Sequence, residues 1–244
     1  MKIPPNIIAN ADDLGLSNEI NKAILMCYES GFINSTSLLT NTELFASTVL
    51  LIRQNPIIIN IGVHVNLAEG KPVSFFERNE YLDSYGNWNI SKINRKIGYL
   101  RTSDRAAFAK EIYAQIDKAL AAEVPISHID SHYHVHTLPC FYKLFFEAAK
   151  KYNLKLRLAQ SYKENSFIKF AYRQYINQLF KTSNLAYSQR FETVKQYLKA
   201  NRNDLETIEI MLHPKINDYG FLTDHYDEET IAEWIKYLDK DRDV

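Results

Sequence analysis

The chain alternates short apolar runs with longer stretches in which apolar residues recur every three or four positions. Such runs predict β-strands, and the three-to-four spacing predicts amphipathic helices. The first helical stretch has Ser17 or Asn18 as its candidate N-cap and Gly31 as its stop. We expect six strands, at residues 6–10, 35–39, 57–65, 126–130, 154–158 and 207–212. Strands alternating with helices predict an α/β fold with a mainly parallel sheet.

The number of strands narrows the architecture. Residues 164–200 predict two helices broken near Ser183, although a seventh strand could lie near Leu185–Tyr187. Thr42 is expected to cap the helix after the second strand. Six to seven parallel strands favour an irregular TIM-barrel-like (β/α) barrel over an open doubly wound sheet, and the sequence alone does not separate the two. Residues 1–244 contain no repeat or linker, so we expect a single domain.

Residues 66–100 interrupt the alternation. They are rich in turn-forming residues, with aromatic residues interspersed. A connection this long inside a compact domain tends to be functional. We therefore expect one long insertion, a lid over the site; a small extra subdomain is the alternative.

Composition limits the partners. The 29 Lys and Arg balance the 29 Asp and Glu, so no overall charge attracts nucleic acid or an anionic membrane. Two cysteines are too few for a disulfide framework. The N-terminus has neither a signal peptide nor a membrane span, and we expect a cytoplasmic protein. The oligomeric state is open, with a homodimer as one alternative.

Four of the seven histidines fall within Ser127–His136. On a strand, every second residue faces the same side; that side would carry His128, Asp130, His132, His134 and His136. Because a strand rises about 3.3 Å per residue, a single metal could bind only one or two of these histidines. In a helix, His132 and His136 would instead form an i, i+4 pair. Clusters of His and Asp of this kind indicate a metal or catalytic site.

Candidate reactive groups follow several predicted strands. Asp12 and Asp13 follow the first, His64 ends the third, His132 follows the fourth and His213 the last. In barrels and open parallel sheets, sites form where the carboxyl ends of the strands meet. Each residue alone has an ordinary structural explanation as a cap, turn or core residue. Together they predict one site at that edge.

Four segments resemble motifs of the YdjC/ChbG-like carbohydrate deacetylases, in family order and over most of the chain: Asn10–Gly15, Gly62–Gly70, His128–His136 and Glu209–Pro214. The resemblance implies a TIM-barrel-like fold and an Asp-His-His site for one divalent metal. It also implies removal of an N-acetyl group from small acetylated glycans such as chitooligosaccharides. Some members act on other acetylated sugar conjugates, hopanoid glycolipids among them.

The resemblance also implies a role for each matching residue. Asp13, His64 and His132 would bind the metal, with Asp12 as general base and His213 as general acid.

Arg157 matches an arginine that would orient Asp12 or the substrate. One position departs from the family pattern, because Lys215 stands where a glycine commonly follows His-Pro. Glycine allows backbone geometry that lysine resists, so the loop and the substrate can differ.

Some assignments stay open. His134 and His136 are rivals for the acid or base role, whereas Asp130 and Glu209 suit hydrogen bonding to an imidazole or to substrate. The two histidines favour zinc, and the carboxylate tolerates magnesium. A metal-dependent phosphoesterase of a histidine-rich barrel is one alternative function. A non-catalytic glycan- or metal-binding protein is another.

Overall fold

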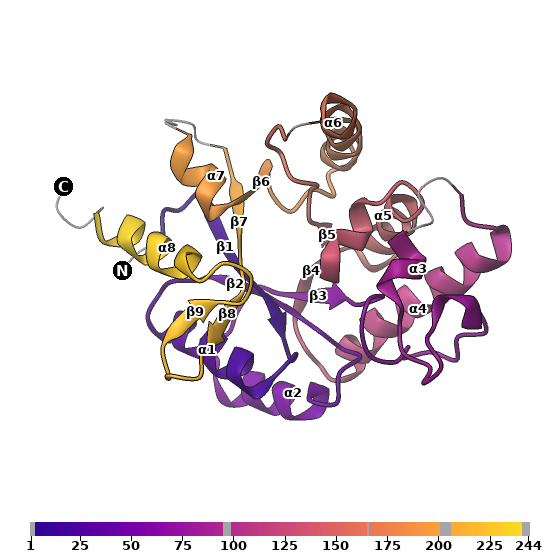
Figure 1. The fold of residues 1–244 in the computed structure, drawn as a ribbon, viewed down its shortest axis with the longest axis horizontal. Helices are drawn as coiled ribbons and strands as arrows, with labels where there is room; N and C mark the ends of the chain where they lie inside the picture. Colours follow the sequence, from indigo (N-terminus) through magenta and orange to yellow (C-terminus); the bar gives the residue numbers. More distant parts are fainter. Residues whose placement is uncertain (1–2, 95–98, 165, 201–205, 241–244) are drawn as a thin grey trace.

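The computed structural model describes residues 3–94, 99–164, 166–200 and 206–240 (Figure 1). The elements, in chain order, are β1 Ile7–Leu14, α1 Asn18–Glu29, β2 Ser35–Leu38, α2 Phe45–Gln54, β3 Ile61–Val65, η1 Asn79–Tyr81, α3 Ile90–Asn94, α4 Thr102–Ala121, β4 Ile126–Ser131, η2 His132–Thr137, α5 Tyr142–Tyr152, β5 Lys155–Leu156, α6 Phe167–Thr182, β6 Arg190–Thr193, α7 Val194–Lys199, β7 Ile208–Leu212, β8 Pro214–Ile216, β9 Leu222–Asp224 and α8 Glu229–Lys240. All six predicted strands are present.

Within these described ranges, seven parallel strands form one curled sheet in the order β5-β4-β3-β2-β1-β7-β6. Helices pack around the sheet, which has the shape of a half-barrel (Figure 1). The predicted α/β barrel-like fold is therefore confirmed. The carboxyl ends of all seven strands meet at one edge, because every pairing is parallel.

The two outer strands of the sheet are linked by residues 185–193. Leu156 in β5 donates its N–H to the carbonyl of Leu185, at 2.7 Å, and accepts from the N–H of Tyr187, at 2.9 Å. A few residues later the chain enters β6, which pairs with β7. The seventh strand thus exists, but at 190–193 rather than near Leu185–Tyr187. The predicted break near Ser183 is present, because Ser183 is the C-cap of α6, and the second helix of 164–200 is the six-residue α7 after β6.

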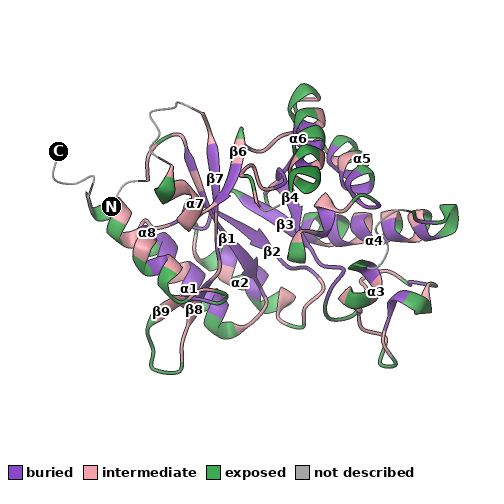
Figure 2. Cartoon of the chain, turned by 45° about the horizontal axis from the view of Figure 1, so that its top comes forward, coloured by how far each residue is buried: buried purple, intermediate pink, exposed green. Residues whose placement is uncertain are grey.

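The two faces of the sheet differ in chemistry. In β3, Ile61, Val63 and Val65 are buried in the apolar core, while Gly62 and His64 alternate with them. A Cβ on Gly62 would lie 2.4 Å from Nε2 of His128, so this position requires glycine. The strands of the large sheet are mostly buried, and exposed residues lie on the outer sides of the helices and in loops (Figure 2). The polar residues of the site can therefore line the inner face without disrupting the apolar core outside.

Local differences from the sequence prediction concern element ends. Thr42 does not cap α2 with its side chain; Leu44 is the N-cap, without a side-chain hydrogen bond. The strand expected over 57–65 begins at Ile61, because a turn at Asn55 precedes it, with the N–H of Ile58 donated to the carbonyl of Asn55. The hairpin of β8 and β9 was not predicted. It packs against α1.

The segment 66–100 contains η1 and α3, and residues 95–98 lie outside the described part. Its aromatic residues Phe76, Tyr81 and Trp88 pack around Phe108 of α4, with ring centroids 4.8–6.0 Å from that ring. These rings therefore extend the apolar core. The lid role and the single-domain assignment stay predictions.

Among the described helices, none combines the length and the apolar character that crossing a membrane requires.

Candidate metal and catalytic site

Asp12 and Asp13 are among the last residues of the strand β1, whereas the sequence predicted them just after it. Strict alternation would send the two side chains to opposite faces. The pairing with β2 shifts register between Ala11 and Leu14, and Asp13 has a positive φ of 70°. This irregularity, of the kind found next to active sites, lets both carboxylates approach His64.

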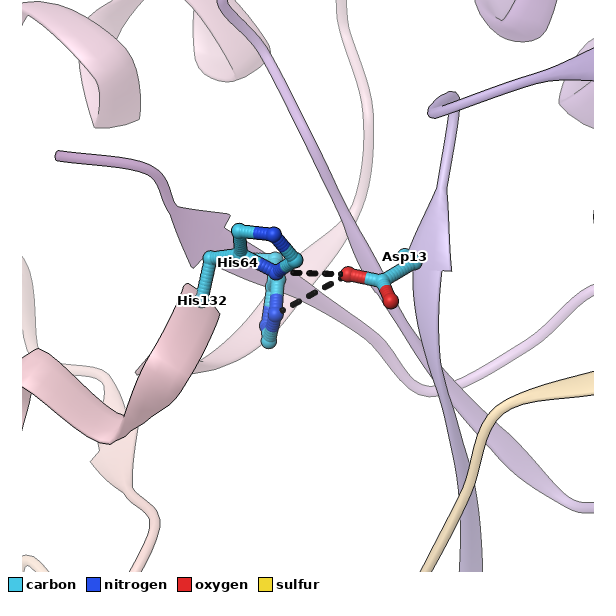
Figure 3. A group of neighbouring side chains, drawn as sticks. All are labelled: Asp13, His64 and His132. Carbon is cyan, nitrogen blue, oxygen red and sulfur yellow. Dashed lines mark ion pairs between the residues drawn. The ribbon is translucent and has the colours of Figure 1, made fainter. Parts of the chain in front are cut away.

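Asp13, His64 and His132 converge from three elements, β1, β3 and η2 (Figure 3). Oδ1 of Asp13 lies 2.9 Å from Nδ1 of His132 and 3.4 Å from Nε2 of His64. The candidate ligand atoms all lie within 4.8 Å of one another, and all three residues are buried. The structure thus brings together the three residues that the family resemblance assigns to the metal.

His64 is held by a second carboxylate. Its Nδ1 lies 2.8 Å from Oδ1 of Asp130. Burial alone would raise the pKa of Asp130, but Arg157 and His64 hold it well below the usual value. An ionised carboxylate only accepts hydrogen bonds, so Nδ1 of His64 carries a proton, and Nε2 is the ring nitrogen that faces Asp13.

The three residues fit a divalent cation. Asp13 is buried; its Oδ1 faces the two imidazole nitrogens, and its Oδ2 has no hydrogen-bond partner among the described residues. The imidazoles of His132 and His64 outweigh the effect of burial and hold the pKa of Asp13 well below its usual value. Burial by itself lowers the pKa of His64, but Asp130 and Asp13 raise it to about 10. The site therefore favours positive charge. A divalent cation bound by one carboxylate oxygen and two imidazole nitrogens would supply that charge.

A second group of residues, Asp12, His64 and Asp130, also meets the distance criterion for a metal. Arg157 already occupies both of its carboxylates: Nη1 and Nη2 lie 2.7 Å from Oδ2 and Oδ1 of Asp12, and Nη1 lies 2.7 Å from Oδ2 of Asp130. A cation there would compete with a guanidinium. The first group fits better.

Arg157 is fully buried and also donates from Nε to Oε1 of Glu209, at 2.6 Å. Burial alone would raise the pKa of Asp12, but Arg157 and His64 outweigh it and hold that pKa below the usual value. Burial instead raises the pKa of Glu209 to about 7, against the effect of Arg157. Asp12 and Asp130 are thus the ionised carboxylates of this network.

β4 ends at Ser131, within one residue of the predicted end at Asp130, so the strand does not continue through His132, His134 and His136. Residues 132–137 form η2, in which Tyr133 and His134 have positive φ of 53° and 54°. His134 lines the cavity beside the Asp13 cluster. His136 is fully buried, with Nδ1 2.7 Å from Oγ of Ser131. Of the five residues, His128 and Asp130 thus lie in β4, whereas His132, His134 and His136 lie in η2 and leave the alternation of the strand.

His213 follows β7 as predicted. Its Nε2 lies 3.8 Å from Oδ2 of Asp12, and its backbone N–H donates to Oδ2 of Asp224, at 2.8 Å. Tyr226 packs edge-on against the His213 ring at 4.5 Å. His213 therefore lies at the cavity wall, close to Asp12.

A cavity of about 320 Å³ joins these groups. Its lining residues are Asp12, His64, Ser131, His132, Tyr133, His134, Thr193, Lys195, Met211, His213, Asp224, Tyr226, Asp227 and Thr230. None of the described residues of 66–100 is among these lining residues. Residues 193–195 and 224–230, which contribute to this cavity, were not predicted from the sequence. The turn residue Gly220 was a sequence signal for the β8–β9 hairpin, which brings Asp224 and Tyr226 to the site.

Fold and site together define an α/β barrel-like protein with a buried Asp-His-His cluster at the carboxyl edge of its sheet. The chain belongs to the YdjC-like protein family, whose model matches residues 6–243. The resemblance inferred from the four motifs is thereby confirmed.

Relatives and a solved structure agree with this assignment. Carbohydrate deacetylase 1 of Listeria innocua serovar 6a is 31% identical over 234 residues, which are 96% of this chain and 86% of the relative. A carbohydrate deacetylase of Vibrio cholerae serotype O1 is 29% identical over 214 residues, 87% of this chain and 79% of the relative. A solved structure from Enterococcus faecalis V583, named for cellobiose-phosphate cleavage, has a TM-score of 0.75 at 22% identity and covers 97% of this chain and 94% of that one. The last comparison supports the fold.

Proposed function

We propose that this protein is a metal-dependent hydrolase that removes an N-acetyl group from a small, chitooligosaccharide-like glycan. The relatives named carbohydrate deacetylases support the substrate class. The observation that carries the proposal is one cavity in which an ionised carboxylate, Asp12, lies beside the Asp13–His64–His132 cluster, with His213 next to it.

Asp13, His64 and His132 would hold one divalent ion, magnesium or zinc. When bound, such an ion supplies an activated water and polarises the acetyl carbonyl. Asp130 keeps His64 in the tautomer that offers Nε2 to this position.

Asp12 would act as the general base and accept a proton from the attacking water. Arg157 holds both of its oxygens, which fixes the carboxylate and keeps it ionised at neutral pH. Asp12 therefore begins each turnover ready to accept a proton. Glu209 and Asp130 would serve as further partners that position Arg157.

His213 would protonate the departing amine, because an amine leaves poorly without that proton. The two rivals are less suited. Burial, together with the nearby charge of Arg157, lowers the pKa of His134 to about 3, and burial lowers that of His136 well below its usual value. Neither imidazole readily carries a proton to donate. His213 lines the cavity and is partly exposed, with 14% of its side-chain surface accessible.

A phosphoesterase would need cationic contacts for the phosphate. The residues that line the cavity include one lysine, Lys195, whose Nζ lies 2.7 Å from Oδ2 of Asp227. The charge that a phosphate would require is thus already paired. A purely binding protein would have no use for Asp12 beside the cluster.

The test measures acetate released from N,N′-diacetylchitobiose by the full chain, first after chelator treatment and then after addition of Mg²⁺ or Zn²⁺. Deacetylation that depends on the added ion supports the proposal. A phosphomonoester assayed in parallel separates the two hydrolase classes. If the disaccharide is bound but unchanged with either ion, the protein is a binding protein instead.

A further inference from the structure

Each imidazole of the cluster lies between two carboxylates. For His64, Nε2 faces Asp13 and Nδ1 faces Asp130. For His132, Nδ1 faces Asp13 at 2.9 Å, and Nε2 faces Oε1 of Glu69 at 3.9 Å. Both imidazoles share Asp13 on one side. On the other side, Glu69 faces His132 in the same way that Asp130 faces His64.

The position of Glu69 is fixed by its neighbours. Its backbone N–H donates to Oδ1 of Asn66, at 3.0 Å, and its carbonyl accepts from Nδ2 of Asn41, at 2.9 Å. Tyr133 donates its hydroxyl to Oε1 of Glu69, at 3.0 Å. The backbone of Glu69 is thus held in place, and its carboxylate lies on the side of His132 away from Asp13.

Tyr133 reaches Glu69 because of its unusual backbone. Its positive φ of 53° is uncommon for a residue other than glycine, and such strained residues cluster at functional sites. The Tyr133 ring packs edge-on against His132, with centroids 4.4 Å apart. One side chain therefore contacts both the imidazole and the carboxylate that faces it.

We propose that Glu69 is a positioning residue for His132: it accepts a hydrogen bond from Nε2–H and thereby leaves the lone pair of Nδ1 directed at the place where the cation would bind. The inference rests on the proposed metal-dependent function. The 3.9 Å separation is about 1 Å longer than a typical N–H···O hydrogen bond, and a small rotation of the Glu69 side chain closes it. That side chain is 48% exposed and is free to make this movement.

Fixing the tautomer of a metal-binding histidine typically contributes 10–100-fold to metal affinity. The affinity of the chelator-treated full chain for Zn²⁺, measured by calorimetry, tests this role. We expect Glu69→Ala to bind Zn²⁺ roughly 10–100-fold more weakly. We expect Glu69→Gln to recover part of the loss, because its amide oxygen still accepts a hydrogen bond.

Glu43→Ala is the matched control. Glu43 is exposed and lines, with Glu69, a neighbouring cavity of about 360 Å³, so this change removes the same charge without touching His132. Wild-type affinity in Glu43→Ala, together with an unchanged melting temperature in Glu69→Ala, supports a specific role. Equal losses in the two alanine variants would point to general electrostatics and overturn the proposal.

A second readout does not depend on affinity. In the Zn²⁺-loaded wild-type chain, nitrogen NMR of His132 is expected to show a protonated Nε2; the opposite tautomer overturns the proposal. If the wild-type chain binds no divalent ion, the proposed function fails as well. If it binds Zn²⁺ and Glu69→Ala binds equally well, only the role of Glu69 is lost.

Discussion

Arg157 binds both carboxylate oxygens of Asp12, with Nη1 and Nη2 each 2.7 Å from one oxygen. The two residues are 145 positions apart in the chain and are both buried. This bidentate pair places the proposed base under the control of an arginine that never reaches the cavity wall. It fixes the direction of the carboxylate and lowers its pKa. The lower pKa makes Asp12 a weaker base but keeps it ionised.

The Asp12→Asn variant should keep its metal and lose turnover. Asp12 is outside the Asp13–His64–His132 cluster, so Zn²⁺ affinity in calorimetry should stay at the wild-type level. Loss of acid–base help is expected to lower kcat by roughly 10²–10⁴-fold in the acetate-release assay. The matched control is Asp218→Asn, an exposed residue in the turn between β8 and β9. Full activity in Asp12→Asn would remove Asp12 from the mechanism.

Replacing Arg157 with Met should destabilise the fold. The change leaves Asp12, Asp130 and Glu209 buried without their shared cation. Removing one partner of a buried ion pair costs about 3–5 kcal/mol, which urea unfolding of the metal-free chain would detect. Arg53→Met is the control, because the Arg53 side chain is 53% exposed in its pair with Glu123 and such pairs contribute about 0–1 kcal/mol. Similar losses in the two variants would contradict the assigned role of the buried network.

The His213→Gln variant should lose rate according to the leaving group. With a sugar amine the expected decrease in kcat is roughly 10²–10⁴-fold, since the amine must be protonated to leave. With an acetylated nitroaniline, whose amine leaves readily, the decrease should be much smaller. His225→Gln, an exposed neighbour, serves as control. If His213→Gln keeps the wild-type rate on the sugar, the acid role passes to His134 or His136.

His128 should make stability depend on pH. Burial, together with the charge of Arg157, lowers its pKa from 6.5 to about 4, although Asp130 acts in the other direction. Between pH 6.5 and 4 the unfolded chain therefore binds a proton that the folded chain does not. The contribution of His128 is complete above pH 6.5 and is lost as the pH falls toward 4, by roughly 3 kcal/mol in total.

The measurement compares urea unfolding of wild type and His128→Gln at several pH values. The variant should show a smaller decrease in stability between pH 6.5 and 4, because glutamine does not titrate. In the wild type, the His128 ring stacks on Tyr187, with ring centroids 3.9 Å apart. We expect the loss of this packing in the variant to lower its free energy of unfolding by the same amount at every pH. Identical pH slopes in the two chains would show that His128 is not the titrating group.

The sequence by itself determined the parallel α/β sheet and its six main strands, because apolar periodicity is a local signal set by burial. It also placed Asp12, Asp13, His64, His132 and His213 at one edge, since parallel strands present their carboxyl ends together. The order of the four motifs identified the family, because each motif carries candidate site residues at or near the end of a strand.

Only the tertiary structure decided how these groups contact one another. The bulge at Asp13 and the left-handed residues Tyr133 and His134 break the alternation on which a strand pattern relies. The strand β6 and the hairpin that carries Asp224 are stabilised by pairing with distant segments, so no local pattern marks them. The bond between Arg157 and Asp12 likewise depends on the curl of the sheet, which packing of the whole chain sets.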